Sequence, residues 1–190
     1  MNYDNFESLD LSKSYTFADY LLFTFKEKVE IIKGKIFEMS PAPSTLHQQI
    51  SWNLTGTFWQ ILKAKSCRAF AAPYDVYLIK ETEEQAIVQP DICVVCDTNK
   101  IKEHGCVGSP DLIIEILSPG NSRRELKTKF ELYQENKVQE YWIIYPLEQS
   151  IHRYILDEKK LEYIPQKPNT VGDEIDWRGN KLLTDDIFLN

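Results

Sequence analysis

A single acidic residue inside an apolar run is the feature that most constrains this chain. Glu115 stands within residues 112–117, Leu-Ile-Ile-Glu-Ile-Leu, where every other residue is apolar. Such a run is typical of a central strand with both faces covered. A carboxylate buried there costs several kcal/mol unless it is paired, protonated or bound to metal. The sequence therefore predicts a partner for Glu115: a metal ion or, as the structural alternative, a lysine or arginine near a sheet edge.

A second acid occupies a comparable place. Asp91 follows Pro90 and directly precedes the apolar run Ile92-Cys-Val-Val95. Carboxylates from two neighbouring strands suit Mg²⁺, or Mn²⁺ in its place, and leave coordination positions for water and a phosphate oxygen. Such a site also needs a fixed cation near the nucleophile, to stabilise the transition state. On this interpretation the pair of acids predicts a metal site in which the ion activates a water and offsets charge growing on a phosphate.

Hydrophobic periodicity predicts helices alternating with strands. Thr16 followed by Asp19 is typical of a helix N-cap, and Ile50, Leu54 and Phe58 recur at helical spacing. We expect a short helix after residue 16, a long one from residue 44 or 45 to about 65, another over 125–136, and strands over 30–39 (a hairpin around Lys33-Gly34), 68–79, 86–95, 112–117, 138–145, 151–156 and 160–165. This order predicts an α/β fold, a mixed β-sheet flanked by helices.

Size and composition bound the domain organisation. With 190 residues, 43% hydrophobic and 27% charged, the chain has the profile of one globular domain over residues 1–190. Residues 1–14 are expected to be an irregular arm, and residues 147–190 to hold late strands and a polar tail that wraps the surface from 169 onward. No apolar run approaches the roughly 20 residues that span a bilayer, and the start lacks the features of a signal peptide. We therefore expect no membrane association and a cytoplasmic location.

The four cysteines, Cys67, Cys93, Cys96 and Cys106, are too few for a disulfide scaffold in a chain of this length. We expect free thiols in a reducing compartment. Cys93-Val-Val-Cys96 with His104 and Cys106 suggests a zinc site as an alternative. Residues three apart in a strand point to opposite faces, however, which argues against zinc.

The net charge of −7 argues against strong, indiscriminate adhesion to nucleic acid, which requires cationic side chains on the phosphates. It does not exclude a nuclease, because carboxylates that hold a divalent cation make a site locally acidic and the bound metal reverses that field.

Several segments closely resemble the Uma-two family, restriction-endonuclease-like proteins formerly grouped as a domain of unknown function, within the PD-(D/E)XK nuclease superfamily. The resemblance extends from about residue 15 to residue 146 and more weakly to the C-terminus. The segments that carry it are Glu30-Ile-Ile-Lys-Gly34, Met39-Ser-Pro-Ala-Pro43, His47, Gln89-Pro-Asp91, Pro110-Asp-Leu-Ile-Ile-Glu-Ile-Leu-Ser-Pro119, Lys129-Phe-Glu-Leu-Tyr133 and Val138-Gln-Glu-Tyr-Trp-Ile-Ile-Tyr-Pro146.

The resemblance implies a restriction-endonuclease-like sheet with Asp91 and Glu115 as its metal-binding acids. The lysine usually found two residues after the second acid is replaced by Leu117. The resemblance implies that the lysine is displaced onto the next helix as Lys129, with Lys127 as the weaker candidate. The structural alternative for Lys129 is an i,i+4 surface pair with Glu125, which stands where the family usually has aspartate.

Two further residues enter the site through the resemblance. Glu30 corresponds to an N-terminal acid that completes the metal site in related nucleases, although composition alone makes it a solvated acid on a hairpin. His47, at the start of the long helix, orients a phosphate or water near neutral pH, or is a polar helix-end residue. Ser118 and Asp75 also match family positions. Tyr133 and Trp142 are predicted to be core residues.

The leading hypothesis is a Mg²⁺-dependent endonuclease that hydrolyses DNA, with Asp91, Glu115 and Glu30 as metal ligands, Lys129 and His47 as further catalytic residues, and no organic cofactor. A homodimer is expected, because one small domain needs a partner to cut both strands of a duplex. Two alternatives stay open: an inactive nuclease fold that acts as a binding or scaffold module, and a nuclease acting on RNA or structured nucleic acid.

Overall fold

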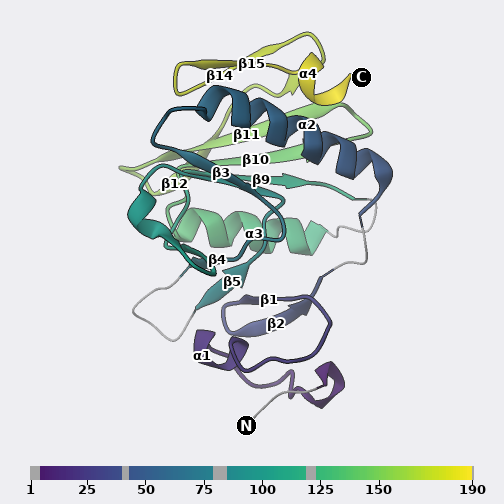
Figure 1. Ribbon diagram of the computed structural model, residues 1–190, viewed down its shortest axis with the longest axis vertical. Helices are drawn as coiled ribbons and strands as arrows, with labels where there is room; N and C mark the ends of the chain where they lie inside the picture. Colours follow the sequence, from purple (N-terminus) through teal and green to yellow (C-terminus); the bar gives the residue numbers. More distant parts are fainter. Residues whose placement is uncertain (1–4, 40–42, 79–84, 119–122, 190) are drawn as a thin grey trace.

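The computed structural model describes residues 5–39, 43–78, 85–118 and 123–189. A seven-stranded sheet lies at its centre, with α2 on one face and α3 on the other (Figure 1). The strand order is β12-β11-β10-β9-β6-β3, with β13 also paired to β11, and β9 and β10 are parallel while the other pairs are antiparallel. Its strands are β3 (Arg68–Ala71), β6 (Ile92–Val95), β9 (Leu112–Ile116), β10 (Glu140–Tyr145), β11 (Ser150–Asp157), β12 (Glu162–Pro165) and β13 (Asn169–Thr170).

A second sheet extends from the α3 side toward the N-terminal end of the molecule (Figure 1). Its order is β2 (Lys35–Glu38), β1 (Val29–Ile32), β5 (Ala86–Val88), β4 (Val76–Leu78), β8 (Gly105–Val107) and β7 (Ile101–Lys102). The short helices η1 (Phe6–Ser8) and α1 (Phe17–Tyr20) precede it, and η2 (Thr98–Lys100) precedes β7. In α1 the predicted cap is confirmed as a capping box between Thr16 and Asp19. The predicted hairpin is confirmed as β1 and β2.

The two long helices follow the predicted apolar stripes. In α2 (Thr45–Leu62) the Ser44 side chain accepts a hydrogen bond from the His47 N–H and caps the first turn, and the apolar stripe packs on the sheet. In α3 (Arg123–Glu135) Leu132 and Tyr133 are buried beneath the opposite face. The prediction of both helices is confirmed, although α2 ends at Leu62 rather than near residue 65.

Alternation along the central strands divides the core into two clusters. On β9, Leu112, Ile114 and Ile116 pack with α2, whereas Ile113 packs on the α3 side. Successive side chains of a strand point to opposite faces, so Glu115 lies on the same face as Ile113. The α/β fold with a mixed sheet flanked by helices, and the central position of β9 between β6 and β10, are therefore confirmed.

The predicted strand over residues 86–95 is wrong as one element. Residues 86–88 form β5 of the second sheet, and residues 92–95 form β6 of the central sheet. Pro90 lies between them, and a proline cannot donate a ladder hydrogen bond, so the chain changes sheet there. The predicted strand over 68–79 likewise divides into β3 and β4, and its last residue, Ile79, lies outside the described residues.

The expectation of a polar surface tail is also wrong. Residues 169–189 form β13, the hairpin of β14 (Glu174–Trp177) and β15 (Asn180–Leu183), and α4 (Asp185–Phe188). This hairpin and α4 pack against one side of α2 and leave the side that carries Trp52 and Trp59 exposed (Figure 1). Ile175, Trp177, Leu182 and Ile187 are buried in the α2 cluster. The tail completes the core because alternate apolar residues in short strands suffice to bury one face.

Two cysteines correct the expectation of free thiols. Cys67 and Cys96 form a disulfide between the neighbouring strands β3 and β6, where Arg68 pairs with Val95. Cys93 and Cys106 are free and buried. Cys93 packs on the α3 side and Cys96 on the α2 side, so the predicted opposite orientation of the two is confirmed.

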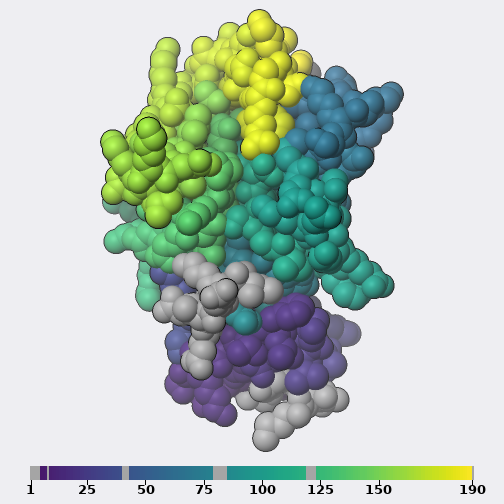
Figure 2. Space-filling view, turned by 90° about the vertical axis from the view of Figure 1, so that its left-hand side faces the viewer, coloured from purple at the N-terminus to yellow at the C-terminus, as the bar shows by residue number. Residues whose placement is uncertain are grey.

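The molecule is elongated, and its described ends lie far apart. The N-terminal elements form one end and the β14–β15 hairpin with α4 the other, with α3 and the central sheet between them (Figure 1). In Figure 2 the purple N-terminal residues and the yellow C-terminal residues likewise lie at opposite ends. The first residues of the expected N-terminal arm, 1–4, lie outside the described part; the rest includes η1. No helix in the described part is long and apolar enough to cross a bilayer.

Candidate active site

Glu115 lies in the middle of the central sheet, not at its edge. Its strand β9 pairs with β10 on one side and β6 on the other, and Glu115 itself is opposite Ile143. The side chain is 11% exposed and points toward α3. The structural alternative was a lysine or arginine partner near a sheet edge. Glu115 does have a lysine partner, but the pair lies in the middle of the sheet and is buried.

That partner is Lys129, on the buried side of α3. Its Nζ lies 3.1 Å from Glu115 Oε1 and 3.1 Å from Glu30 Oε1, and its side chain is 9% exposed. Lys127, two residues earlier, is 77% exposed and lies 3.7 Å from Glu131 on the same helix. The structural alternative for Lys129, an i,i+4 ion pair at the surface, is therefore not what Lys129 forms; Lys127 forms such a pair. Lys129 occupies the position that the resemblance implies for the displaced lysine.

Tyr133 adds a contact that the sequence interpretation missed. It follows Lys129 by one helical turn, is fully buried, and donates a hydrogen bond of 2.6 Å from its hydroxyl to Glu115 Oε1. Tyr133 was predicted as a core residue, and it is one, but its hydroxyl belongs to the acid cluster. The i,i+4 spacing from Lys129 was a signal that could have placed both side chains on the same face.

Glu30 comes from β1 of the second sheet and is buried, not solvated on the hairpin as composition suggested. Its Oε1 accepts hydrogen bonds from the Gln89 backbone N–H at 3.0 Å and from Lys129. The Gln89 side chain donates to Asp75 Oδ1 at 2.6 Å, and Asp75 also accepts from the Tyr77 hydroxyl at 3.0 Å. This chain of hydrogen bonds fixes the segment that holds Glu30.

Asp91 stands just before β6 and has the more accessible carboxylate. Its Oδ2 accepts a 2.7 Å hydrogen bond from the Ile116 N–H, the residue after Glu115, and its Oδ1 lies 3.2 Å from His47 Nε2. The Asp91 side chain is 21% exposed, whereas His47 is buried at the start of α2. His47 is thus held against the acid and does not serve merely as a polar helix end.

The electrostatics of this cluster follow from its burial. Burial raises the pKa of Glu115 to about 7, aided by the negative charges of Asp91 and Glu30 and opposed by Lys129. Burial alone would lower the pKa of Lys129, but the two glutamates outweigh it and raise that pKa. Burial also opposes protonation of His47, yet its hydrogen bond with Asp91 raises the His47 pKa above the ordinary value.

These residues fit a divalent cation that keeps much of its own hydration. Three carboxylates, Glu30, Asp91 and Glu115, face a single lysine, so the site carries excess negative charge. Across the described ranges, no three His, Cys, Asp or Glu side chains form a group that could hold a metal by themselves. Mg²⁺ commonly binds through one or two carboxylates, with waters and substrate phosphates as the other ligands. Asp91 and Glu115 are the two carboxylates that would serve as its ligands, whereas a closed zinc cage requires more protein ligands.

The structure thus brings all five predicted residues into one neighbourhood. Glu115, Lys129 and Glu30 are linked directly by ion pairs, and Asp91 with His47 is linked to them through the backbone of Ile116. Their catalytic roles stay predictions. A hollow of about 200 Å³ opens near by, lined by residues 44 and 46 at the start of α2, residues 117 and 118 after β9, and residues 145–148. Ser118, which matched a family position, lines this hollow.

Comparison with known proteins gives the same fold and family. The model of the family Uma2, described as "Putative restriction endonuclease", matches residues 16–178. An uncharacterized protein of Synechocystis sp., slr1290, is 28% identical over 120 residues, which cover 63% of this chain and 61% of that protein. The alignment therefore spans about three fifths of the length of this curated relative.

A solved structure shares the fold. The crystal structure of a "putative nuclease belonging to DUF820" from Anabaena variabilis matches with a TM-score of 0.69 at 22% identity, over 92% of this chain and 97% of that chain. At this identity the likeness concerns the fold, and it agrees with the predicted restriction-endonuclease-like sheet. The match of the family model over most of the sequence carries the assignment: the chain belongs to the Uma2 family of restriction-endonuclease-like proteins.

Proposed function

We propose that this protein is a Mg²⁺-dependent endonuclease that hydrolyses phosphodiester bonds in DNA. The observation that carries the proposal is the buried contact of Lys129 with both Glu115 and Glu30, close enough to Asp91 for the charge of Asp91 to raise the pKa of Glu115. Buried charges are costly, and a cluster that is not needed for packing is a candidate functional site. The family supports nucleic acid as the class of substrate.

In this proposal Asp91 and Glu115 hold the metal ion, and Glu30 remains the predicted auxiliary ligand. A bound Mg²⁺, or Mn²⁺ in its place, lowers the pKa of a coordinated water and offsets charge on the phosphate. The Ile116 N–H and His47 fix the orientation of the Asp91 carboxylate. Tyr133 does the same for Glu115 through its hydroxyl.

Lys129 is the fixed cation of the proposed site. Two carboxylates at 3.1 Å keep its ammonium charged and restrict its position. A cation held in advance stabilises negative charge that develops on a phosphate without reorganising during the reaction. His47, protonated more readily than an ordinary histidine, orients a water or a phosphate oxygen from the α2 side.

A non-catalytic scaffold is the second candidate, and the net charge of −7 is the observation in its favour. An acidic protein gains little affinity for nucleic acid from its overall field. A scaffold function requires neither metal nor cleavage, so the two candidates differ in a measurable way. A homodimer is part of the nuclease proposal, because one site for each strand permits a double-strand cut.

The test combines metal binding with cleavage. We expect the wild type to bind Mg²⁺ or Mn²⁺ in a calorimetric titration, and Glu115→Ala to lose that binding. With metal present, the wild type should cut supercoiled plasmid, and parallel reactions with single-stranded DNA and RNA identify the preferred polymer.

Lys129→Met and Lys127→Met form a matched pair of variants on one helix. Only the first removes the buried cation, so cleavage should be lost in Lys129→Met and retained in Lys127→Met. A wild type that binds no divalent metal and cuts none of the three substrates would contradict the nuclease proposal and favour the scaffold.

A further inference from the structure

The outer face of α2 differs from the rest of this highly charged chain. Between Thr45 and Leu62 the helix contains no Asp, Glu, Lys or Arg, although 27% of the whole chain is charged. Helices at the surface of a soluble protein usually carry charges on their exposed side. Depletion of charge and enrichment in tryptophan are features of the central part of protein interfaces.

Two tryptophans project from this face. Trp52 is 78% exposed and Trp59 is 62% exposed, while the other two tryptophans of the chain, Trp142 and Trp177, are buried. Trp52 and Trp59 are seven residues apart, which places them on the same side of the helix, two turns from each other. They form a pair of large apolar side chains that the monomer leaves in water.

Gly56 lies between the two tryptophans and has no explanation within the monomer. A Cβ added at this position would meet no atom within 4 Å, so neither the sheet nor the tail requires a glycine there. A glycine inside a helix lowers helix stability relative to alanine. It does allow another backbone to approach closely.

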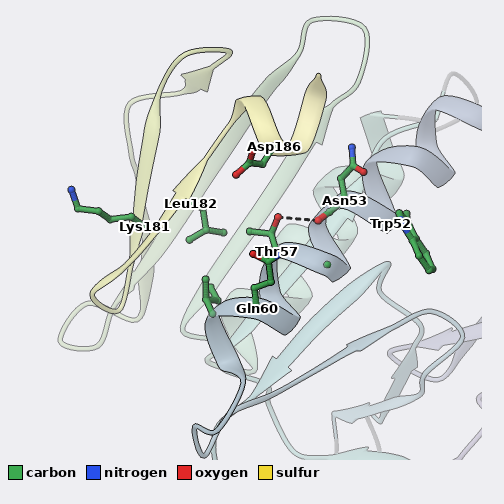
Figure 3. A pocket seen from close by; sticks show the side chains of 9 residues that line it. Trp52, Asn53, Thr57, Gln60, Lys181, Leu182 and Asp186 are labelled. Atoms are coloured by element: carbon green, nitrogen blue, oxygen red, sulfur yellow. Dashed lines mark hydrogen bonds between the residues drawn. The ribbon is translucent and has the colours of Figure 1, made fainter. Parts of the chain in front are cut away.

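A hollow of about 420 Å³ adjoins this face between α2 and the C-terminal layer. In Figure 3, Leu182 and Asp186 lie across the hollow from Asn53 and Thr57, and Lys181 points away from it. Trp52 stands at the rim on the α2 side. Protruding tryptophans and a hollow therefore occupy the same surface.

We infer that the outer face of α2 is the surface through which two copies of this chain associate, around a twofold axis that passes near Gly56. In this arrangement the two α2 helices cross at Gly56, and a tryptophan of each copy enters the hollow of the other. A twofold contact uses the same patch on both subunits, so it requires a patch that carries both the projection and the recess.

Charge selects a second copy over other partners. Two copies with a net charge of −7 repel each other, and α2 itself brings no charged side chain into the contact between Thr45 and Leu62; Asp186 and Lys181 line the adjoining hollow as one charge of each sign. Nucleic acid would need several cations, but Lys63 is the cation at the end of this face, with its Nζ 5.0 Å from the Trp59 ring centre. A membrane-surface helix would likewise be rich in Lys or Arg.

The experiment measures oligomeric state in the intact chain without substrate or metal. Sedimentation velocity over a dilution series should show a wild-type dimer, and Trp52→Lys and Gly56→Lys should each raise the dimer dissociation constant at least about thirtyfold. Both positions are exposed, so the thermal midpoint of the monomer should be retained. Leu11→Lys, at an exposed apolar residue between η1 and α1 and so outside α2 and the C-terminal layer, is the control and should leave the dimer unchanged.

A cross-linking arm locates the contact directly. Gly56→Cys should give a dimer with a short bis-maleimide reagent, whereas Leu11→Cys and the wild type should not. A monomeric wild type, a dimer that survives Gly56→Lys, or variants that lose nucleic-acid binding while the dimer persists would each overturn the inference. The inference rests on the homodimer of the proposed function, and these measurements test that homodimer alone. Metal binding and cleavage are measured separately, so loss of the dimer and loss of nuclease activity can be told apart.

Discussion

The two faces of the central sheet are built from the same strands but bury different kinds of side chain. On the α2 side the core is hydrophobic, with Phe58 packed between Trp142 and Trp177. On the α3 side the same sheet buries Glu115 and Lys129. Since neighbouring residues of a strand point to opposite faces, a single strand such as β9 contributes to both.

This division separates stability from chemistry. The apolar face needs only complementary shape, so its residues stabilise the fold through burial. The charged face keeps its carboxylates buried at an energetic cost, which packing on the other face offsets. We therefore expect substitutions of the acid cluster on the α3 side to affect cleavage first, and substitutions of the apolar residues on the α2 side to affect stability first.

The largest expected effect is on the α3 side. Glu115→Gln keeps the shape of the side chain but removes its charge, and it should lower the cleavage rate about a thousandfold. The rate should be measured on plasmid under single-turnover conditions. An active Glu115→Gln variant would mean that the buried acid cluster is structural and that the two faces do not differ in function.

The next largest expected effect is a loss of stability on the α2 side. Phe58→Ala removes a fully buried ring from between two tryptophans and should cost about 3–5 kcal/mol of the free energy of unfolding. Urea denaturation measures this loss, and cleavage at low temperature, where the variant stays folded, should match the wild type. A parallel loss of cleavage in the folded variant would show that the two faces are coupled.

A smaller effect should arise where Tyr133 meets Glu115. Tyr133→Phe deletes one hydroxyl and should cost about 1–2 kcal/mol of stability, because Glu115 loses a hydrogen bond but keeps Lys129. The lost bond also favoured the charged form of Glu115, so the acidic limb of the pH–rate profile should move to higher pH. A purely packing role would leave that limb where it is.

The smallest effect is a pH dependence of stability in chelator-treated protein. Glu115 faces Lys129 and Tyr133 from α3, Glu30 from β1 and Asp91 before β6, and its folded pKa is raised to about 7. A carboxyl with a raised pKa binds more protons in the folded state, so its contribution is fully present below the unfolded pKa and is lost as pH rises through about 7. Thermal midpoints should therefore fall from pH 5 to pH 8.

A shallower slope in Glu115→Gln would assign that dependence to this residue. Part of the slope should remain, because the raised pKa of His47 acts with the same sign. A slope equal to that of the wild type would show that Glu115 titrates as an ordinary carboxyl.

Sequence patterns predicted the elements that carry their own periodicity. The stripe of Ile50, Leu54 and Phe58 indicated α2, and the apolar run around Glu115 indicated a central strand. The disulfide between Cys67 and Cys96 was missed because it depends on the register of β3 against β6. Register depends on which strands pair, and no local pattern contains that information.

The candidate site shows the same limit. Burial identified Glu115 as anomalous, and resemblance supplied Lys129, but neither indicated that Glu30 would approach the same ammonium from another sheet. Pro90 explains why the chain passes from the second sheet to the central sheet between β5 and β6. The sequence analysis predicted a single strand across this proline. Tyr133 was predicted as a core residue because its aromatic ring suits the apolar stripe of a helix. A buried tyrosine can pack its ring in the core and still use its hydroxyl in a hydrogen bond, and the sequence does not show which partner that hydroxyl has.

The separation between Glu30 and Lys129 has a consequence during synthesis. The two residues are 99 positions apart in the sequence, and their contact requires both sheets and α3 to be in place. A growing chain on the ribosome has no buried cation until α3 has been made and has packed. A nascent or truncated chain that ends before α3 therefore carries the acids without the lysine, and the proposed site is completed late in the production of each molecule.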